Sequence, residues 1–338
     1  MKKTLILLLI LAFTFSFYSC EKKDPEPQSR HFFEYFDTFG TFSDYSGLKK
    51  EEFNLLADRV ESELAEYHKL YDIYNEYEGI TNLKTINDLA GSGPITVDKK
   101  IVNLLLFAKE MFLYTNGNVN VAMGSVLKIW HDYRTEGVEL PPKELLEEAN
   151  KHTDINNLII NEENSTVEIT DSKARLDVGA IAKGYAVEMI CETLEAEGYS
   201  GFVLDLGGNL KAVGTKPSGK GWITGIKNPD PLAEDGFIYR HELKDSSTVT
   251  SGNYERYYTV NGKRYHHIIN KDTLMPADFY SSVSIITSSS ALADALSTAI
   301  FNMTPEEAKA FVESKKGLSV VLLTTDGKLE ILEGIPHK

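Results

Sequence analysis

Residues 176–188 read LDVGAIAKGYAVE and join a carboxylate, a glycine–alanine turn and a lysine to the start of an amphipathic helix. Glycine at such a turn lets a ligand approach the backbone closely, and the helix N-terminus favours phosphate-like anions. A plain strand–turn–helix junction, in which Asp177 only caps the helix, explains this stretch equally well. The stretch therefore needs a partner elsewhere in the chain before it indicates a ligand site.

The patterns around this stretch predict an α/β (α+β) fold: one continuous domain with a mostly antiparallel sheet and packed helices. Apolar residues recur at helical spacing in five segments, at 49–71, 98–114, 181–197, 291–303 and 305–314. Strand patterns cover 201–214 and much of 222–287, with a two-residue hairpin turn at Asn261-Gly262. The break at 207–209 indicates a β-bulge or a close approach of a ligand. Residues 71–87 read as a polar loop.

Residues 1–19 have the pattern of a lipoprotein signal peptide, with two lysines, an apolar run and then Cys20 directly after a small residue. A lipid on the Cys20 thiol would anchor the protein to a bacterial membrane, facing the periplasm or the exterior. Simple secretion and an uncleaved anchor are the alternatives. Residues 20–30 are expected to form a flexible polar tether, and residues 31–338 the folded domain. Cys191 then has no disulfide partner and reads as a packed thiol.

The composition limits the classes of partner and of enzyme. A formal net charge of −15 argues against nucleic acid as a partner, since nucleic acid needs a positive footprint. The chain has no His-Glu-x-x-His, Gly-x-Ser-x-Gly, phosphate-loop or Gly-x-Gly-x-x-Gly motif. A zinc hydrolase, a serine hydrolase and a nucleotide-binding fold of those types are therefore not expected.

The predicted helix at 291–303 carries Asp294 and Thr298 four residues apart, and so on one helical face. Both are hard oxygen donors, which suit Mg²⁺ or Ca²⁺ better than zinc. Their neighbours are mostly apolar, so the helix should be buried, and a buried carboxylate needs a cation or a hydrogen-bond donor. A solvated helix surface is the ordinary alternative. His266 and His267 would point to opposite faces of a strand, where one of them could reach a site.

Seven segments, taken in this order, resemble the ApbE family, the flavin transferases that attach FMN to other proteins. The segments are TFGT (38–41), NGNVNVAMGSVLKIW (116–130), LDVGAIAKGYAVE (176–188), LDLGGNLKAVG (204–214), TSGNYERYY (250–258), GKRYHHIIN (262–270) and ADALSTAIF (293–301). They span nearly all of the chain that follows the leader. The resemblance implies an ApbE-like fold and a Mg²⁺-dependent FAD:protein FMN transferase, with FAD as the substrate. Such an enzyme cleaves the FAD pyrophosphate, joins FMN through a phosphoester to a Ser or Thr hydroxyl of a target protein, and releases AMP.

The resemblance also implies roles for individual residues. The metal ligands would be Asp294, Thr298 and the backbone carbonyl of Ala180, with Ser297 beside them. The chemistry of the reaction, in which the acceptor hydroxyl loses a proton, leaves two candidates for the general base, Asp294 and His267. The residues expected to contact FAD are Phe39, Tyr74, Asn118, Val119, Asn120, Asp177, Lys183 and Ile269.

Four positions depart from the family pattern. The chain has Phe39 where Met is common, Asn120 and Asn270 where Asp is common, and Leu274 where Gly is usual. Two rival functions remain, a FAD pyrophosphatase that yields FMN and AMP, and a flavin-binding lipoprotein without chemistry. The acceptor of a transferase would be a protein with a Ser/Thr flavinylation motif, such as a subunit of a membrane redox complex.

Overall fold

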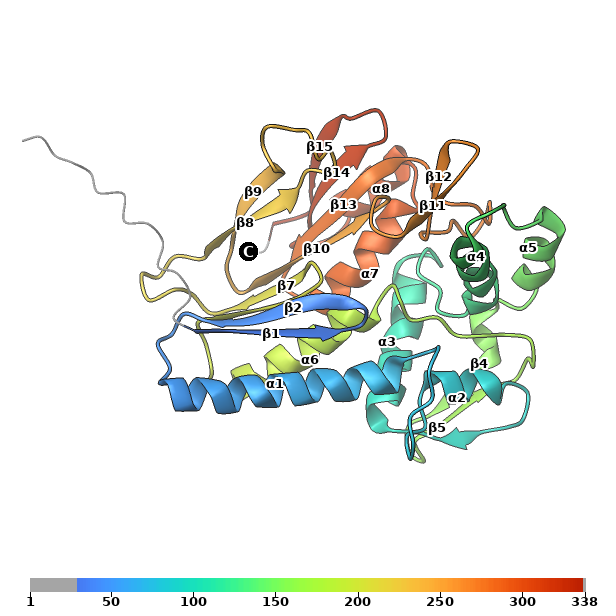
Figure 1. The fold of residues 1–338 in the computed structure, drawn as a ribbon, viewed down its shortest axis with the longest axis horizontal. Helices are drawn as coiled ribbons and strands as arrows, with labels where there is room; N and C mark the ends of the chain where they lie inside the picture. The colour runs from blue at the N-terminus through green and yellow to red at the C-terminus, as the bar shows by residue number, and fades with distance from the viewer. Residues whose placement is uncertain (1–28, 337–338) are drawn as a thin grey trace, which may run out of the picture.

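The computed structural model describes residues 29–336, and their largest element is an eight-stranded antiparallel sheet (Figure 1). The strand order is β1-β2-β6-β7-β10-β13-β14-β15, and every neighbouring pair is antiparallel. The strands are β1 (Ser29–Tyr35), β2 (Thr38–Asp44), β6 (Phe202–Leu206), β7 (Asn209–Val213), β10 (Ser246–Gly252), β13 (Tyr280–Thr287), β14 (Ser319–Thr324) and β15 (Leu329–Glu333). The predicted mixed fold with a mostly antiparallel sheet is confirmed.

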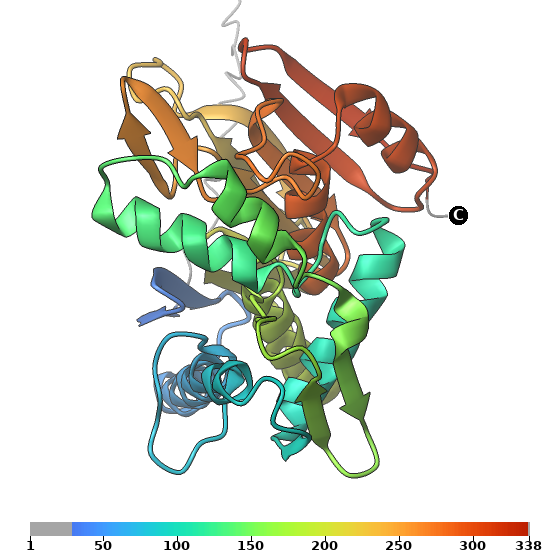
Figure 2. The ribbon, with the colours of Figure 1, turned by 90° about the vertical axis from the view of Figure 1, so that its right-hand side faces the viewer.

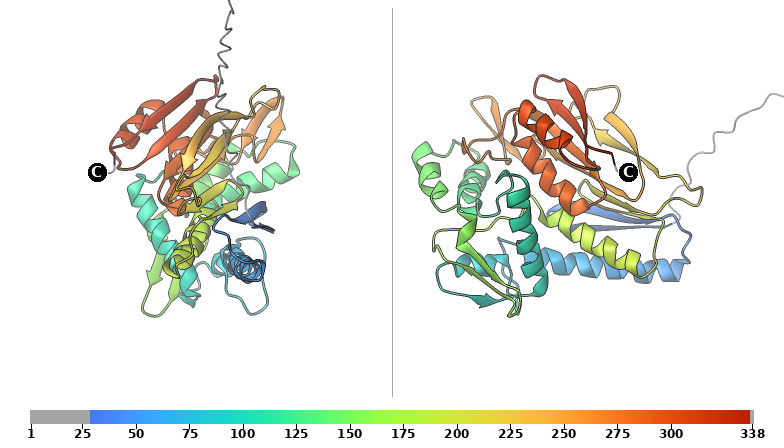
Figure 3. Two further views of the ribbon diagram at one scale, coloured as in Figure 1. Left: turned by 90° about the vertical axis from the view of Figure 1, so that its left-hand side faces the viewer. Right: turned by 180° about the vertical axis from the view of Figure 1, so that it is seen from behind.

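Three helices pack beside this sheet, as the views from the front and from behind show (Figures 1 and 3). They are α1 (Lys50–Tyr71), α6 (Ala182–Ala196) and α7 (Ser290–Phe301). Helix α7 contacts β10, β13 and α6, while α1 contacts β1. The apolar positions predicted for α1 are buried, because their three- and four-residue spacing forms one face of the helix.

The remaining elements lie around this central unit (Figures 1 and 2). They are helices α2 (Leu83–Asp88), α3 (Lys99–Tyr114), α4 (Gly124–Glu136), α5 (Lys143–Asn150) and α8 (Pro305–Glu313), the short 3-10 helix η1 (Ile155–Asn157), and strands β3 (Ile95–Thr96), β4 (Leu158–Asn161), β5 (Thr166–Ile169), β8 (Trp222–Lys227), β9 (Phe237–Leu243), β11 (Tyr257–Val260) and β12 (Lys263–His266). The pairs β8–β9 and β11–β12 are separate two-stranded sheets, and β3-β5-β4 forms a three-stranded one. One large hydrophobic core joins side chains of the main sheet with those of α1, α3, α6 and α7.

The structure corrects three expectations. Residues 207–209 form neither a bulge nor a gap in one strand, because β6 and β7 pair with each other across a turn at Gly207-Gly208. Both glycines have positive φ, which such tight hairpin turns require. The loop expected at 71–87 contains most of α2, whose first turn is capped by Asn82. Strand β1 begins at Ser29, two residues before the expected start of the folded domain.

Two further sequence expectations concern single cysteines and the membrane. Cys191 is fully buried in α6, as predicted, and burial raises the pKa of its thiol. Cys20 and the proposed signal peptide lie outside the described residues. Within residues 29–336, no helix is long and apolar enough to cross a membrane.

Candidate active site

The carboxylate of Asp294 lies where α7 crosses the start of α6. Its Oδ2 accepts a hydrogen bond of 2.8 Å from the backbone N–H of Gly184, and its Oδ1 is 3.9 Å from the Lys183 ammonium nitrogen. A side chain at position 184 would not fit, since a Cβ there would lie 2.4 Å from the Asp294 Cβ and 2.4 Å from the Ser290 carbonyl oxygen. The structure thus brings together the stretch 176–188 and Asp294, which are more than a hundred residues apart.

Little positive charge lies close to the Asp294 carboxylate. Asp294 is 4% exposed, and burial raises its pKa, while Lys183 and the Gly184 N–H act in the opposite direction. An ion-pair distance of 3.9 Å is at the limit of a direct contact. A buried carboxylate in this setting would be stabilised by a further cation.

The other predicted metal ligands lie on the same two segments of the chain. The N–H of Gly184 donates to Asp294 and not to the carbonyl of Ala180 four residues earlier, so within residues 29–336 this carbonyl accepts no hydrogen bond. Thr298 is half-buried, one helical turn after Asp294. The hydroxyl of Ser297 is fully buried, donates to the Asp294 carbonyl at 2.8 Å and lies 2.7 Å from the Ser251 hydroxyl.

The donor chemistry fits a hard divalent cation. Within the described part of the chain there is no cluster of three or more His, Cys, Asp or Glu side chains that could hold a metal ion. A cation here would therefore be held by one carboxylate, a hydroxyl, a backbone carbonyl and the oxygens of a bound phosphate. Oxygen-only coordination with few protein ligands is what Mg²⁺ prefers. We call the residues 180–184, Asp294, Ser297 and Thr298 the helix half of the site.

A second group of polar side chains gathers around Tyr74. Its ring centroid is 4.8 Å from that of His131, and its hydroxyl lies 3.4 Å from the His131 Nδ1 atom. Arg134, one helical turn further along α4, places Nη2 3.2 Å from the same nitrogen. Burial and the charge of Asp177 raise the pKa of Tyr74 to about 12, so its hydroxyl stays protonated near neutral pH.

Asp177 and His267 belong to the same group, because both lie within electrostatic reach of Arg134 and Arg256. Burial raises the pKa of Asp177, while the hydrogen bond that it accepts from the Gly179 N–H and the charges of these arginines lower it. Burial, then Arg256, His266 and Arg134, lower the pKa of His267 to about 3, so its imidazole is neutral. We call Tyr74, His131, Arg134, Asp177, Arg256 and His267 the loop half of the site.

Five other predicted FAD contacts have side chains that are exposed, buried or already hydrogen-bonded within the protein. Phe39 is 76% exposed at the β1–β2 hairpin, whereas Val119 and Ile269 are buried, so those two could reach a ligand only through the backbone. The side-chain amide of Asn118 donates to the Thr115 carbonyl. Asn120 uses its amide for the Thr153 carbonyl and for the Ala122 N–H.

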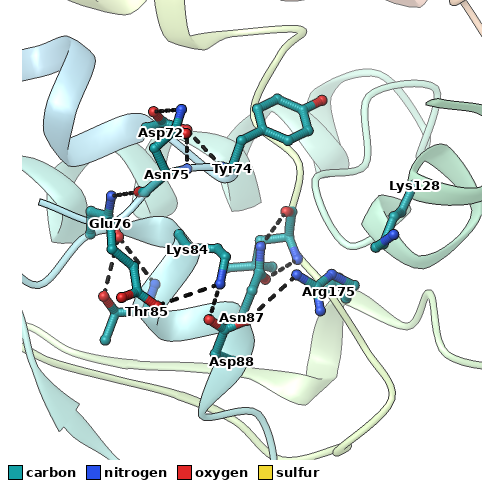
Figure 4. A network of polar contacts seen from close by, with 12 residues as sticks. Asp72, Tyr74, Asn75, Glu76, Lys84, Thr85, Asn87, Asp88, Lys128 and Arg175 are labelled. Atoms are coloured by element: carbon teal, nitrogen blue, oxygen red, sulfur yellow. Dashed lines mark hydrogen bonds and ion pairs between the residues drawn. The ribbon is translucent and has the colours of Figure 1, made fainter. Parts of the chain in front are cut away.

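Sequence reasoning missed the side chains that hold the loop half in place (Figure 4). Asp72 accepts hydrogen bonds from the backbone N–H groups of Tyr74 and Asn75, which fixes the loop that carries the Tyr74 ring. Asn87, buried on α2, both donates to and accepts from the backbone of Leu176, at 2.9 and 2.6 Å. The N–H of Asp177 then donates to the Val121 carbonyl. The only feature of the sequence that could have revealed the role of Asn87 is its position as a polar residue on the apolar face of a short helix.

A buried ion pair supports the helix half and was also missed. Glu188 of α6 and Lys211 of β7 lie 3.2 Å apart, and both are less than 10% exposed. The Glu188 carboxylate accepts a hydrogen bond from the backbone N–H of Ser290, the first residue of α7. The pair therefore ties the N-terminus of α7, which carries Asp294, to α6 and to the sheet.

Comparison with known proteins agrees with this architecture. The model of the ApbE family matches residues 39–322. The FAD:protein FMN transferase of Treponema pallidum is 32% identical over 267 residues, which are 75% of this chain and 73% of that protein. The FAD:protein FMN transferase of Escherichia coli K12 is 25% identical over 328 residues, 94% of this chain and 92% of that protein. The crystal structure of the ApbE protein from Thermotoga maritima superposes with a TM-score of 0.80 at 27% identity, covering 90% of this chain and 97% of that one.

The class defined by this fold and site is that of the flavin transferases. The chain belongs to the ApbE family, and the resemblance carried by the seven sequence segments is confirmed.

Proposed function

We propose that this protein is a FAD:protein FMN transferase that uses a divalent cation, normally Mg²⁺. The proposal is supported by family membership and by the curated relatives, which are named FAD:protein FMN transferase. The observation that carries the chemistry is the helix half. There a buried carboxylate and a hydroxyl of α7 meet the turn before α6, which supplies a carbonyl without a donor.

The proposed reaction moves the FMN half of FAD to a Ser or Thr hydroxyl of an acceptor protein. The hydroxyl oxygen forms a bond to the phosphorus on the FMN side of the pyrophosphate. The bond from that phosphorus to the bridging oxygen breaks, and AMP leaves with the bridging oxygen. The proton of the hydroxyl passes to a base, and the acceptor retains FMN as a phosphoester.

Asp294, Thr298 and the Ala180 carbonyl are the residues that would hold the cation, with Ser297 beside them. A bound Mg²⁺ neutralises charge on the pyrophosphate oxygens, which is worth several kcal/mol in phosphoryl-transfer reactions. The N–H of Gly184 orients the Asp294 carboxylate by its hydrogen bond to Oδ2, so that Oδ1 is left for the cation. The ammonium group of Lys183, close to the same carboxylate, is placed to contact FAD.

His267 is the better candidate for the general base. Asp294 already accepts a hydrogen bond from Gly184 and serves the proposed cation, whereas the imidazole of His267 is neutral and can accept a proton. Burial is the main factor that opposes its protonation in the free protein, and the positive charges of Arg256 and Arg134 add to it. The negative charge of a bound pyrophosphate would offset them and raise the proton affinity of the imidazole.

Tyr74 and Asp177 of the loop half are proposed FAD contacts. The Tyr74 ring is 51% exposed, and the Asp72 network fixes the loop that carries it. Arg134 and Arg256 have no carboxylate within 4 Å in residues 29–336, so their positive charge is available to an anionic substrate.

We also propose that Cys20 carries a lipid that anchors the enzyme to the membrane. Labelling with a radioactive fatty acid tests this, and a Cys20→Ser variant should remain unlabelled.

The proposed function is tested by incubating the protein with FAD, MgCl₂ and a candidate acceptor. The account expects one FMN added to the acceptor, seen by mass spectrometry, and an equal amount of AMP, seen by chromatography. Free FMN with an unmodified acceptor would make the protein a FAD pyrophosphatase. Bound FAD with no product would make it a flavin carrier. Either result would overturn the transferase.

A further inference from the structure

The small sheet β11–β12 leaves one edge of β12 without a neighbouring strand in the described part of the chain. The two strands are joined by the two-residue turn Asn261-Gly262, and Val260 pairs with Lys263. In such a hairpin, alternate residues direct their backbone groups to the partner strand. The backbone N–H and C=O groups of Lys263 and Tyr265 therefore point towards β11, while those of Arg264 and His266 point away from it.

Hydrogen bonds further along the chain confirm these directions. The His267 N–H donates to the Arg256 carbonyl, on the β11 side. On the other side, the Ile268 carbonyl accepts from Ala277 at 3.0 Å, and the Asn270 N–H donates to Met275 at 2.9 Å. The outer edge is thus paired at residues 268 and 270.

Going back along the chain from Ile268, the next two residues whose backbone groups point to the outer edge are His266 and Arg264. At these two residues the edge is unpaired within the part of the chain that the structure describes. In residues 29–336, no group forms a hydrogen bond with the backbone of Arg264 or with that of His266 on this side. The side chain of His266 does contact this region, because its Nε2 atom lies 2.7 Å from the Ala277 carbonyl oxygen. The free edge therefore starts directly beside an existing β-type pairing.

A cavity of about 460 Å³ runs along this free edge. Residues 263–266 all line it, together with Asn253, Tyr254 and residues 275–278. Since neighbouring side chains of a strand point to opposite faces, a cavity that touches four consecutive residues must follow the strand edge. Four residues of strand span about 13 Å, which is room for an added strand of similar length.

Two residues that line the cavity are near neighbours in sequence of groups in the proposed reaction centre. His266 at its inner end is followed directly by His267, the proposed base. Asn253 comes two residues after Ser251, whose hydroxyl lies 2.7 Å from that of Ser297 in the helix half. A chain segment bound along the edge therefore has one end beside the catalytic groups.

We infer that the acceptor protein docks here, with an extended segment paired as an additional strand on the outer edge of β12. The inference rests on the proposed function, which requires a polypeptide substrate next to the FAD site. Unpaired strand edges bind extended peptides through main-chain hydrogen bonds. The reactive Ser or Thr lies just beyond the His266 end of the segment.

The decisive variant is Arg264→Pro, because proline removes the N–H that faces the cavity, a group that the ladder to β11 does not use. Thr259→Pro is the matched control. Thr259 is the cross-strand partner of Arg264, and its N–H faces the opposite edge of the hairpin, away from the cavity. Arg264→Ala separates the loss of the guanidinium group from the loss of the N–H. Asp278→Trp fills the cavity from its other wall and leaves β12 intact, should Arg264→Pro fail to fold.

The acceptor is first identified by adding the wild-type protein, FAD and MgCl₂ to proteins of the source cell and finding the protein that gains flavin fluorescence in a gel. That acceptor is then purified and serves as the probe. The inference expects the KM for this acceptor to rise at least tenfold in Arg264→Pro and in Asp278→Trp, with the KM for FAD within twofold of wild type. Thr259→Pro and Arg264→Ala should change the acceptor KM less than threefold. An unchanged acceptor KM in both Arg264→Pro and Asp278→Trp would overturn the docking edge and leave the transferase function intact. A wild-type protein that labels no acceptor would overturn both.

Discussion

The two halves of the candidate site are built from different kinds of structure. The helix half joins two packed helices, and its carboxylate is 4% exposed and bonded to a backbone N–H. The loop half gathers side chains from a loop, from α4, from the segment before α6 and from the two ends of the β11–β12 hairpin, and Tyr74 is 51% exposed. The difference matches two tasks. Charged phosphates and a cation need fixed, buried oxygen atoms, whereas a large planar ring needs an accessible surface.

If the helix half performs the chemistry, Asp294→Asn should have the largest effect on activity. The substitution keeps the size of the side chain but removes its charge, so FMN transfer should fall about 10³-fold. FAD affinity, set mainly by the loop half, should change only a few-fold. Rates of FMN transfer and fluorescence titration with FAD measure the two effects. Asp44→Asn is the control, since Asp44 is equally buried but binds only the turn after β2. Equal loss of transfer in both variants would contradict the assignment.

The close contact between the helices can be tested through Gly184. In Gly184→Ala the new methyl group would meet Asp294 and the Ser290 carbonyl, so α6 and α7 must separate. We expect a loss of about 3 kcal/mol in the free energy of unfolding, as for other overpacked cores, and a parallel loss of transfer. Gly236→Ala provides the control, because nothing lies within 4 Å of the place that its new methyl group would occupy. Urea unfolding checks both variants, and a Gly184→Ala protein as stable as wild type would show that the helices can adjust.

In the loop half, Tyr74→Leu should have a smaller and more selective effect. Loss of an aromatic surface costs about 1 kcal/mol, so the dissociation constant of FAD should rise roughly fivefold. Stability should change by less than about 0.5 kcal/mol because the ring is half exposed. Fluorescence titration and thermal unfolding measure these changes. A destabilised protein with normal FAD affinity would mean that Tyr74 has a structural role.

A further effect concerns pH and His267. Its pKa in the folded protein is about 3, below the usual value of about 6.5 in an unfolded chain. Between these values the unfolded state binds more protons, so the contribution of His267 lowers stability as the pH falls below about 6.5. A His267→Gln variant should therefore lose less thermal stability than wild type between pH 7 and pH 5. Identical pH profiles would contradict the neutral state of this imidazole.

The sequence predicted the helix half better than the loop half. Asp294 and Thr298 share one helical face, and the apolar neighbours of Asp294 indicated that it is buried. Both features depend on local spacing. The loop half could not be assembled in this way, because the contacts of Tyr74 with His131, and of Asn87 with Leu176, join segments far apart in the chain. Only the family resemblance placed Tyr74 and Asp177 in one site, and it gave no signal for Arg134 or Arg256.

For the fold as well, local features were predictable from the sequence and long-range pairings were not. The periodicity of apolar residues was enough to predict α1, α3, α6, α7 and α8, and Asn261-Gly262 was enough to predict the β11–β12 turn. The order of strands was not predictable, since β2 lies next to β6 although about 160 residues separate them, and such pairing is decided by tertiary packing. The Gly207-Gly208 turn was missed because two glycines are compatible with both a bulge and a hairpin.

The most direct measurement is a crystal structure of the protein with FAD and Mn²⁺, in which anomalous scattering locates the metal. The account predicts a metal peak bound by the Asp294 carboxylate, the Thr298 hydroxyl and the Ala180 carbonyl, in contact with the FAD phosphates, while the flavin or its ribityl chain reaches Tyr74. A peak elsewhere, or FAD bound at this place with no metal, would contradict a cation site divided between the stretch 176–188 and α7.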